Sequence, residues 1–276
     1  MDREFDAATM SIGFIGAGKM AQALTRGFLA SRITSKEQII ASAPTLQSIS
    51  DIKKYGIHVT CNNQETVQDS KVVVVAVKPN VVPSVLREVS PVVTRDHLFV
   101  SIAAGVRIKS IEEELPPQTR VVRVMPNTPC LVQQAVSVLS TGSSAKNGDA
   151  EFVKRLMSAV GHVEESDENI LDAVTGLSGC GPGYMFMALD AMADGGVRCG
   201  LPRDKAVQLA AHTMMGAAKM VLDSGKHPAQ LKDDVCSPSG ATIHAISRLE
   251  KLGFRGAIID AVMTAFERTH ELGQSK

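Results

Sequence analysis

A glycine-rich segment near the start of the chain has the residue types and spacing of a dinucleotide-binding turn. Residues 13–21 read GFIGAGKMA, so an apolar strand pattern ends in G-x-G-x-x-A and a helical pattern begins at once. In such a turn Gly16 permits the tight bend, Gly18 lets the backbone approach a pyrophosphate, and Ala21 lets the helix pack closely on the strand. Because the first amides of that helix would face the phosphates, the segment predicts a bound dinucleotide.

The end of the next predicted strand bears on which dinucleotide is bound. A site specific for NAD places Asp or Glu there to hold the ribose 2′-hydroxyl, whereas this chain has Ser42-Ala43-Pro44-Thr45. No carboxylate repels a 2′-phosphate at this point, and the hydroxyls of Ser42 and Thr45 could donate to one. We therefore predict NADPH as the cofactor. Because no Arg is present to bind the 2′-phosphate, NADH is an alternative.

A run of valines marks a third strand at the same edge of the predicted sheet. The run 72–77 stops at Lys78-Pro79, where Pro79 removes a ladder donor. The carboxyl end of such a strand faces the crevice of a doubly wound sheet, which would place Ala76, Val77 and Lys78 beside the cofactor. For Lys78, an ordinary surface lysine explains the sequence equally well.

Two segments of the second half are too rich in glycine for ordinary helices. Residues 175–183 read TGLSGCGPG and residues 236–242 read CSPSGAT, and both predict close approach of the backbone to another group. The second segment leads into an amphipathic helix at 241–251, so its free amides and hydroxyls could receive a substrate carboxylate. A plain helix cap is the simpler explanation of the same residues.

The chain lacks the residue constellations of several other chemistries. These segments contain no Ser-His-Asp order, no paired carboxylates, no HExxH and no cluster of metal ligands, and His244 stands alone on its helix. We therefore expect no metal, and chemistry that relies on the cofactor and on positioning of the substrate.

The pattern of strands and helices indicates how these groups are positioned. β-Branched runs alternate with helical patterns in the first half, which is typical of βαβ units and a parallel sheet. Met20, Leu24 and Phe28 form one stripe of the first helix, 18–31. After residue 161, Ala, Met, Leu and Gly dominate, so the second half should be helical. Six strands are expected at 11–15, 39–42, 72–77, 98–103, 121–124 and 135–139, and further helices at 170–197, 203–223, 241–251 and 255–272.

We accordingly predict an α/β fold in which a Rossmann-type, doubly wound parallel sheet precedes an all-α dimerisation domain. The domain border is placed at residue 167, giving a cofactor-binding domain over 1–167 and a helical substrate-binding domain over 168–276. Helices rich in Ala and Met, with few charges on some faces, indicate burial against a second subunit.

Composition excludes several classes of partner and site. The 29 Lys and Arg balance 29 Asp and Glu, which gives no reason to expect nucleic acid or an anionic membrane. Five scattered cysteines without a CxxC spacing argue against a disulfide framework or a zinc site. Residues 1–10 contain three acids and one Arg, unlike a transit peptide, and no apolar run has the length of a membrane span. A small molecule is the expected partner and the cytoplasm the expected compartment.

At this point nearly the whole chain resembles one family, the Δ1-pyrroline-5-carboxylate reductases, and looks most like their shorter, cytosolic animal form. The resemblance rests on FIGAGKMA (14–21), AVKP (76–79), SIAAG (101–105), RVMPNTP (123–129), DAVTGLSGCGP (172–182), DGGVRCGLP (194–202) and HPAQLKDDVCSPSGATIHA (227–245).

The resemblance implies reduction of L-Δ1-pyrroline-5-carboxylate to L-proline with NAD(P)H, the last step of proline biosynthesis. It also implies a dimer through the C-terminal helices, assembled as a pentamer of dimers. Thr242 would be catalytic, hydrogen-bonded to the ring nitrogen, and Glu168, Ser237, Gly240, Ala241 and Thr242 would bind substrate. The implied cofactor residues, together with Ser42 and Thr45, are Ile15, Gly16, Ala17, Gly18, Lys19, Met20, Asn63, Ala76, Val77, Lys78, Pro79, Ile102, Ala103, Ala104 and Asp234.

Three positions depart from the family pattern, and two rival functions stand beside the implied one. The family often has Asn at the position of Asp234 and Glu at that of Gly225, and Pro238-Ser239-Gly240 replaces the commoner Pro-Gly-Gly. A β-hydroxyacid dehydrogenase would need a basic Lys after the first glycine-rich segment, but no Lys occurs between Lys154 and Lys205. A non-catalytic NADPH-binding regulator would bind the cofactor without turnover.

Overall fold

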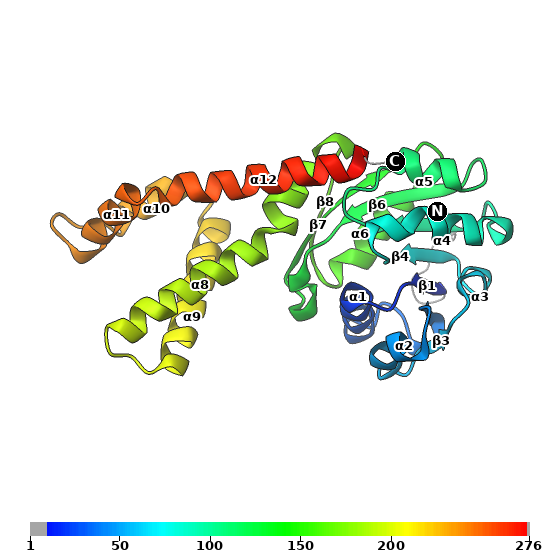
Figure 1. Ribbon diagram of the computed structural model, residues 1–276, viewed down its shortest axis with the longest axis horizontal. Coiled ribbons are helices and arrows are strands. Elements are labelled where there is room, and N and C mark those ends of the chain that lie inside the picture. Colours follow the sequence, from blue (N-terminus) through cyan, green and yellow to red (C-terminus); the bar gives the residue numbers. More distant parts are fainter. Residues whose placement is uncertain (1–9, 275–276) are drawn as a thin grey trace. The chain divides into compact units, whose positions relative to one another are not determined.

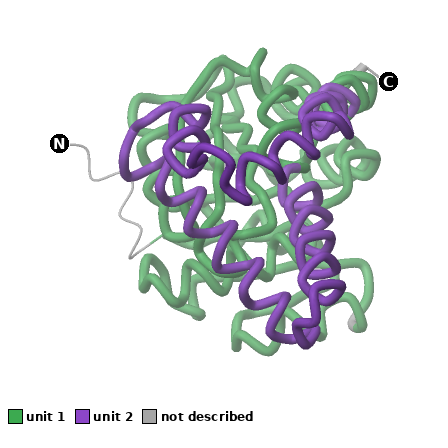
Figure 2. The backbone as a smooth tube through the Cα atoms, turned by 90° about the vertical axis from the view of Figure 1, so that its left-hand side faces the viewer, with its two compact units in different colours: residues 1–180, 265–276 green, residues 181–264 purple. Residues whose placement is uncertain are grey.

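The structure, a computed structural model, describes residues 10–274 (Figure 1). It divides into two compact units, coloured separately in Figure 2: unit 1 comprises the chain up to Cys180 together with the part from Ala265 onward, and unit 2 comprises Gly181–Thr264. The units therefore divide at Cys180, after the residue proposed from sequence as the domain border. The prediction made from residues 1–10 lies, apart from Met10, outside the described residues.

Unit 1 is built on one eight-stranded sheet of order β3-β2-β1-β4-β5-β6-β7-β8. The first six strands are parallel, and the order reverses between β1 and β4, as in a doubly wound dinucleotide-binding sheet. The predicted fold class is thus confirmed. The strands are β1 Ile12–Ile15, β2 Ile39–Ser42, β3 His58–Thr60, β4 Val72–Val75, β5 Leu98–Ser101, β6 Arg120–Met125, β7 Ala135–Thr141 and β8 Gly161–Glu165.

Two details of the predicted sheet were wrong. β3 and β8 were missed, because β3 has only three residues and β8 is largely exposed, so neither gives an apolar run. β7 was expected in a parallel sheet but pairs antiparallel with β6. The connection between them contains only a 3-10 turn, η4 (Thr128–Val132), whereas a parallel neighbour requires a crossover of a dozen or more residues.

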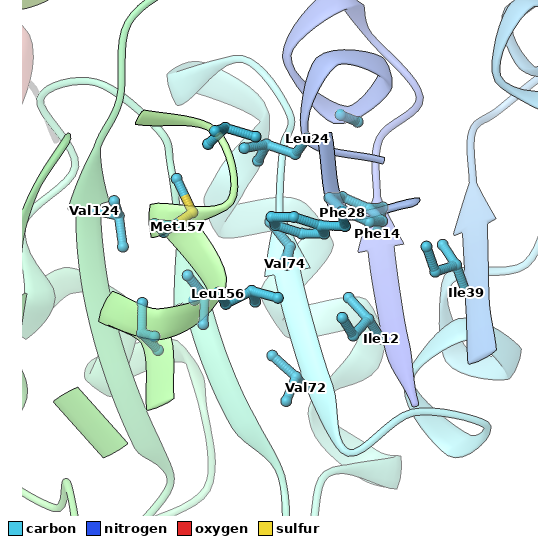
Figure 3. Close-up of a cluster of buried hydrophobic side chains, with 14 of the residues drawn as sticks. Ile12, Phe14, Leu24, Phe28, Ile39, Val72, Val74, Val124, Leu156 and Met157 are labelled. Atoms are coloured by element: carbon cyan, nitrogen blue, oxygen red, sulfur yellow. The ribbon is translucent and has the colours of Figure 1, made fainter. Parts of the chain in front are cut away.

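Helices cover both faces of the sheet because successive side chains of each strand point to opposite faces. Ile12 and Phe14 of β1, with Val72 and Val74 of β4, pack under α1, α2 and α6 (Figure 3). Ile15 and the alternate valines of β4 pack under α3, α4 and α5. These helices are α1 Lys19–Ala30, α2 Leu46–Lys53, α3 Asn63–Gln68, α4 Val82–Val89, α5 Ile108–Glu114 and α6 Asp149–Ser158.

The predicted stripe of α1 lies where expected. Leu24 and Phe28 are fully buried, and Met20 packs against the same core. The α1 helix therefore has a fixed position on β1, which in turn fixes the turn between them.

The segment after β8 continues unit 1 before the helices of unit 2 begin. It contains a short helix, α7 (Leu171–Val174), and a π-helical turn over the first glycine-rich stretch, Thr175–Gly179. Close approach is confirmed at Gly179, where an added Cβ would lie 2.5 Å from the end of Met125.

Unit 2 is all helical, as predicted, and contains one helix that was missed, α10. Its buried residues are small, namely Ala193, Ala206 and Ala210, while many large apolar side chains are exposed. The helices are α8 Gly181–Arg198, α9 Arg203–Ser224, α10 Pro228–Asp234, α11 Ala241–Lys251 and the first part of α12, Phe254–Gln274, which ends in unit 1. No helix among the described residues is both long and apolar enough to span a membrane.

Candidate active site

The turn between β1 and α1 is tightly packed, and this requires glycine at its centre. The Gly16 amide donates to the Ser42 carbonyl at 2.8 Å, and its φ is +106°. A Cβ on Gly16 would lie 2.6 Å from the carbonyl oxygen of Ala76, at the end of β4. The turn at the end of β1 therefore lies between the carboxyl ends of β2 and β4, the two strands that flank β1, where the strand order reverses.

Gly18, in contrast, opens the turn toward the solvent. A Cβ there would meet nothing within 4 Å, and Gly18 begins α1 without any side-chain cap. The first turn of α1 contains no acidic residue, so its free amides and helix dipole present positive charge. These features fit the pyrophosphate of a dinucleotide.

The predicted cofactor residues after β4 and β5 lie along the same sheet edge. The Ala76 amide donates to Ile15 at 2.8 Å, and the Ile102 amide donates to Val75 at 3.1 Å. The structure thereby brings together the segments 15–20, 76–79 and 102–104, which are far apart in the sequence. Ala76, Val77, Pro79, Ile102 and Ala104 are half-buried, Ala103 is buried, and Lys78 is exposed.

At the end of β2, the structure changes the role expected for Ser42. Its side chain is fully buried, and its hydroxyl donates to Oδ1 of Asn63 at 2.7 Å, so it orients Asn63 instead of facing a ligand directly. The side-chain nitrogen Nδ2 of Asn63 donates to the Glu88 carboxylate at 2.9 Å. Thr45 is exposed and caps α2 by accepting from the Ser48 amide at 3.2 Å.

Glu168 lies in a network of charged side chains within unit 1. Its Oε1 accepts from the Ile108 amide at 2.7 Å and from Nη1 of Arg123 at 2.9 Å. Arg123 also reaches Asp172, which accepts from Arg107 at 2.8 Å. Sequence reasoning missed these partners, although an arginine inside the run RVVRVM of a buried strand is a signal of a buried carboxylate.

In unit 2, the second glycine-rich segment forms a tight turn before α11. The Gly240 amide donates to the Ser237 carbonyl at 3.0 Å, and Pro238 and Ser239 occupy the corner. Gly240 begins α11 without a side-chain cap, and Oγ of Ser237 occupies the space that a Cβ on Gly240 would need. The free amides of the first turn are thus open to an anion.

Thr242 stands in that first turn and is exposed, and its hydroxyl has no hydrogen-bond partner within residues 10–274. The neighbouring His244 hydrogen-bonds back to the Gly240 carbonyl at 3.0 Å. A free hydroxyl beside free amides can bind a carboxylate and an adjacent nitrogen together.

Asp234, at the end of α10, is exposed and bonded within its own unit. Its carboxylate accepts from Gln230 at 2.8 Å and from Lys226 at 3.0 Å. The hydrogen bond from Gln230, followed by that from Lys226, lowers the pKa of Asp234. Lys226 therefore balances the charge of Asp234, and Gln230 adds a neutral hydrogen-bond donor.

One group of possible metal ligands occurs in the described part of the chain. His58, Glu65 and Asp69 bring their ligand atoms within 4.8 Å of one another, on β3 and around α3. His58 and Asp69 are exposed, and Glu65 accepts from Thr60. Because Thr60 is the last residue of β3 and pairs with Ser42 of β2, Glu65 of this group lies near the carboxyl ends of these two strands.

Comparisons with known proteins agree with this geometry. Residues 168–272 match the family described as pyrroline-5-carboxylate reductase dimerisation, and residues 11–105 match the family described as NADP oxidoreductase coenzyme F420-dependent. Human pyrroline-5-carboxylate reductase 2 is 52% identical over 95% of this chain and 84% of its own length. Rat pyrroline-5-carboxylate reductase 3 is 44% identical over 95% of this chain and 96% of its own length.

A solved structure extends the similarity to three dimensions. The Plasmodium falciparum pyrroline carboxylate reductase with NADP bound is 31% identical and has a TM-score of 0.89, covering 96% of this chain and 99% of its own. The similarity therefore extends over both units of the chain.

Proposed function

This chain belongs to the pyrroline-5-carboxylate reductase family, and from that premise we propose that it reduces L-Δ1-pyrroline-5-carboxylate to L-proline with NADPH, the last step of proline biosynthesis. The observation that carries the proposal is the 52% identity to the human reductase over 95% of the chain. The uncapped, glycine-lined start of α11, which suits a small carboxylate, supports it independently.

NADPH, when bound, supplies the hydride. The residues that would hold it are those of the sheet edge: 15–20 around the pyrophosphate, 76–79 and 102–104 toward the nicotinamide half, and Asn63 with Thr45 toward the 2′-phosphate. No carboxylate follows β2 at 43–45, so charge does not exclude the phosphate. NADH remains the alternative, because no arginine is present there to favour NADPH strongly. Asp234 is assigned to the nicotinamide half by resemblance alone.

The substrate is a cyclic imine that carries one carboxylate. The amides of Ala241 and Thr242 would bind that carboxylate, with the Ser237 hydroxyl beside them. The Thr242 hydroxyl would accept a hydrogen bond from the protonated ring nitrogen and so fix the orientation of C5. Glu168 would approach the substrate with Oε2, because Oε1 is already engaged by Ile108 and Arg123.

Little acid catalysis is needed in this mechanism. The iminium is already electrophilic, and hydride addition at C5 turns its C=N⁺ bond into the neutral secondary amine of proline. The protein therefore contributes orientation and charge complementarity, worth several kcal/mol in well-oriented systems. This agrees with a substrate turn that contains hydroxyls and amides and no acid–base pair.

The structure also bears on the rival enzyme. A β-hydroxyacid dehydrogenase would need a basic Lys on the helix after the first glycine-rich segment, which here is α8. That helix reads GPGYMFMALDAMADGGVR and contains no Lys. Oxidation of an alcohol would therefore lack its base.

We propose that the chain acts as a homodimer formed through its C-terminal helices and assembled as a pentamer of dimers in the cytoplasm. The match to a dimerisation family over 168–272 supports the dimer. So do the exposed apolar side chains of unit 2, of which Phe186, Met187, Met215 and Leu222 are 61–83% exposed.

The deciding experiment is an assay of the purified protein with pyrroline-5-carboxylate. NADPH consumption with stoichiometric formation of proline is expected, and the same assay with NADH ranks the two cofactors. A folded protein that binds NADPH but forms no proline would instead support the regulator.

A further inference from the structure

A pair of acidic residues holds the segment that directly follows the proposed nicotinamide-side residues 102–104. Glu168 accepts from the Ile108 amide at 2.7 Å, and Asp172 accepts from the Arg107 side chain at 2.8 Å. Both acids also bind Arg123 of β6, at 2.9 Å and 3.4 Å. The carboxyl end of the 102–108 segment is thus connected by two acids, through Arg123, to β6.

The last turns of α12 hold the same segment from another direction, within unit 1. Gly105 has a φ of +75°, and a Cβ there would lie 3.2 Å from the Thr269 carbonyl oxygen. A Cβ on Gly273 would in turn lie 2.7 Å from the Gly105 carbonyl oxygen. His270, between them on α12, lies 3.3 Å from Asp172.

Asp172 connects the segment to both β6 and α12. Its side chain is 2% exposed, and it faces Arg107, Arg123 and His270, which come from a loop, a strand and a helix. A buried ion pair is weak evidence for stability, because desolvation offsets much of the attraction. Such groups are better suited to fixing one geometry, here that of the 102–108 segment.

We propose that Asp172 is a positioning residue for the cofactor: it clamps residues 102–108 between β6 and the end of α12, so that residues 102–104 are preformed for the nicotinamide half of NADPH. This inference rests on the proposed cofactor role of residues 102–104. It makes the end of α12, a helix that starts in the dimerisation unit, part of the support of the cofactor site.

A second buried pair on the same strand provides a matched control. Arg120 of β6 pairs with Asp149, and the two side chains are 3% and 0% exposed. Asp149 also accepts from the Lys146 amide and lies at the start of α6, and it makes no hydrogen bond or ion pair with residues 102–108. Asp149→Asn therefore removes an equally buried charge without touching the clamp.

The test compares Asp172→Asn with Asp149→Asn in the full-length protein. We expect Asp172→Asn to raise both the Kd and the KM for NADPH about tenfold, while kcat changes by less than about threefold. The reason is that the lost interaction would stabilise bound NADPH equally in the ground state and in the transition state. Asp149→Asn should lower Tm but leave the Kd for NADPH within about twofold of wild type. Equal NADPH affinities in the two variants would overturn the proposal.

A steric variant tests the clamp if Asp172→Asn does not fold. Gly273→Ala pushes α12 against the Gly105 carbonyl and should raise the Kd for NADPH about threefold, because the segment is displaced while its charges remain. An unchanged Kd would overturn the proposal.

A direct variant of the segment distinguishes this inference from the assignment on which it rests. Ala104→Glu places a carboxylate where the cofactor is expected and should weaken NADPH binding at least tenfold. If it does not, residues 102–104 do not contact the cofactor, and both ideas fail. If Ala104→Glu weakens binding while Asp172→Asn and Gly273→Ala do not, only the positioning role fails.

Discussion

The buried hydroxyl of Ser42 donates to Oδ1 of Asn63 at 2.7 Å and thereby joins the end of β2 to the start of α3. The other side of the Asn63 amide donates to Glu88 on α4, so the orientation of this side chain is fixed from two directions. Asn63 is half-buried and lies at the end of β2 where the 2′-phosphate is expected. In the proposed cofactor site, recognition of the adenosine end would therefore depend on Asn63, which Ser42 positions.

Ser42→Ala should weaken the binding of NADPH through this contact. Without the hydroxyl, Oδ1 of Asn63 loses its partner, and the amide can rotate away from its present orientation. We expect the KM for NADPH to rise about three- to tenfold, the scale of about 1 kcal/mol for one hydrogen bond, with a smaller rise for NADH. Steady-state kinetics with both cofactors measures this.

Ser158→Ala is the matched control, because it removes an exposed hydroxyl that bonds only to the Lys154 carbonyl of its own helix. It should leave both KM values unchanged. A rise for NADH as large as that for NADPH would contradict the role of Asn63 at the 2′-phosphate.

Local patterns were sufficient to predict most of the sheet and the cofactor turn. The glycine turn at residues 13–18 and the valine-rich strand β4 are recognised from residues that are close together in the sequence. The parallel order of the strands then brings their carboxyl ends together. The direction of β7 was missed although the sequence holds a signal for it, because the connection from β6 contains only η4 and is too short for the crossover of a parallel neighbour. The three-residue β3 is too short to give any periodic pattern.

The charged network around Asp172 could not be predicted for a different reason. Its pairs join residues 49, 65 and 98 positions apart, with Arg123, Arg107 and His270 respectively. Asp172, Arg107 and His270 look like ordinary surface charges in their own segments, and Arg123, inside a buried strand, indicates a buried carboxylate without identifying it. Only the folded chain shows that Asp172 is buried among them.

Thr242→Ala tests the proposed catalytic hydroxyl. Loss of one oriented hydrogen-bonding group should lower kcat/KM by about 10- to 1,000-fold, because the iminium would no longer be held with C5 in place. Thr242 is exposed and bonds to no other side chain in the described residues, so Tm should not change. Thr242→Ser keeps the hydroxyl and should retain most of the activity; wild-type turnover in the alanine variant would remove Thr242 from the mechanism.

The buried His97 should make the folded state sensitive to acid. Burial, the largest cause, lowers the pKa of His97, and its Nδ1 accepts from the Thr94 amide at 2.9 Å. The unfolded chain therefore binds the proton more readily, so stability is complete above the unfolded pKa of about 6.5 and falls as the pH drops below it. Tm measured from pH 8 to about pH 5 should fall less in His97→Asn, which keeps an acceptor for Thr94. If Tm falls equally with pH in the wild type and in His97→Asn, His97 does not cause the loss of stability in acid.

The turn before α11 should tolerate glycine at its strained corner. Ser239 has a φ of +58°, which costs a residue with a side chain about 1–3 kcal/mol. Ser239→Gly removes that cost but adds up to about 1 kcal/mol of entropy in the unfolded chain, so a net gain of up to about 2 kcal/mol is expected. The reverse change, Gly225→Ser, places a side chain where α9 ends with a φ of +63°. It should destabilise the protein by about 1 kcal/mol. Denaturation at one fixed protein concentration measures both, and a less stable Ser239→Gly variant would contradict the strain.

The two glycines of the dinucleotide turn should respond differently to the same added methyl group. At Gly16 a Cβ would lie 2.6 Å from the Ala76 carbonyl, in a backbone conformation with φ of +106°, so Gly16→Ala should lower Tm and weaken NADPH binding together. Gly18 has an ordinary φ of −69° and open space around its Cα, so Gly18→Ala should fold with an unchanged Tm. Its methyl group would instead occupy the space of the pyrophosphate, and the Kd for NADPH should rise at least about tenfold. Binding titrations and thermal unfolding on both variants separate the two effects, and normal NADPH affinity in Gly18→Ala would show that the pyrophosphate does not approach this residue.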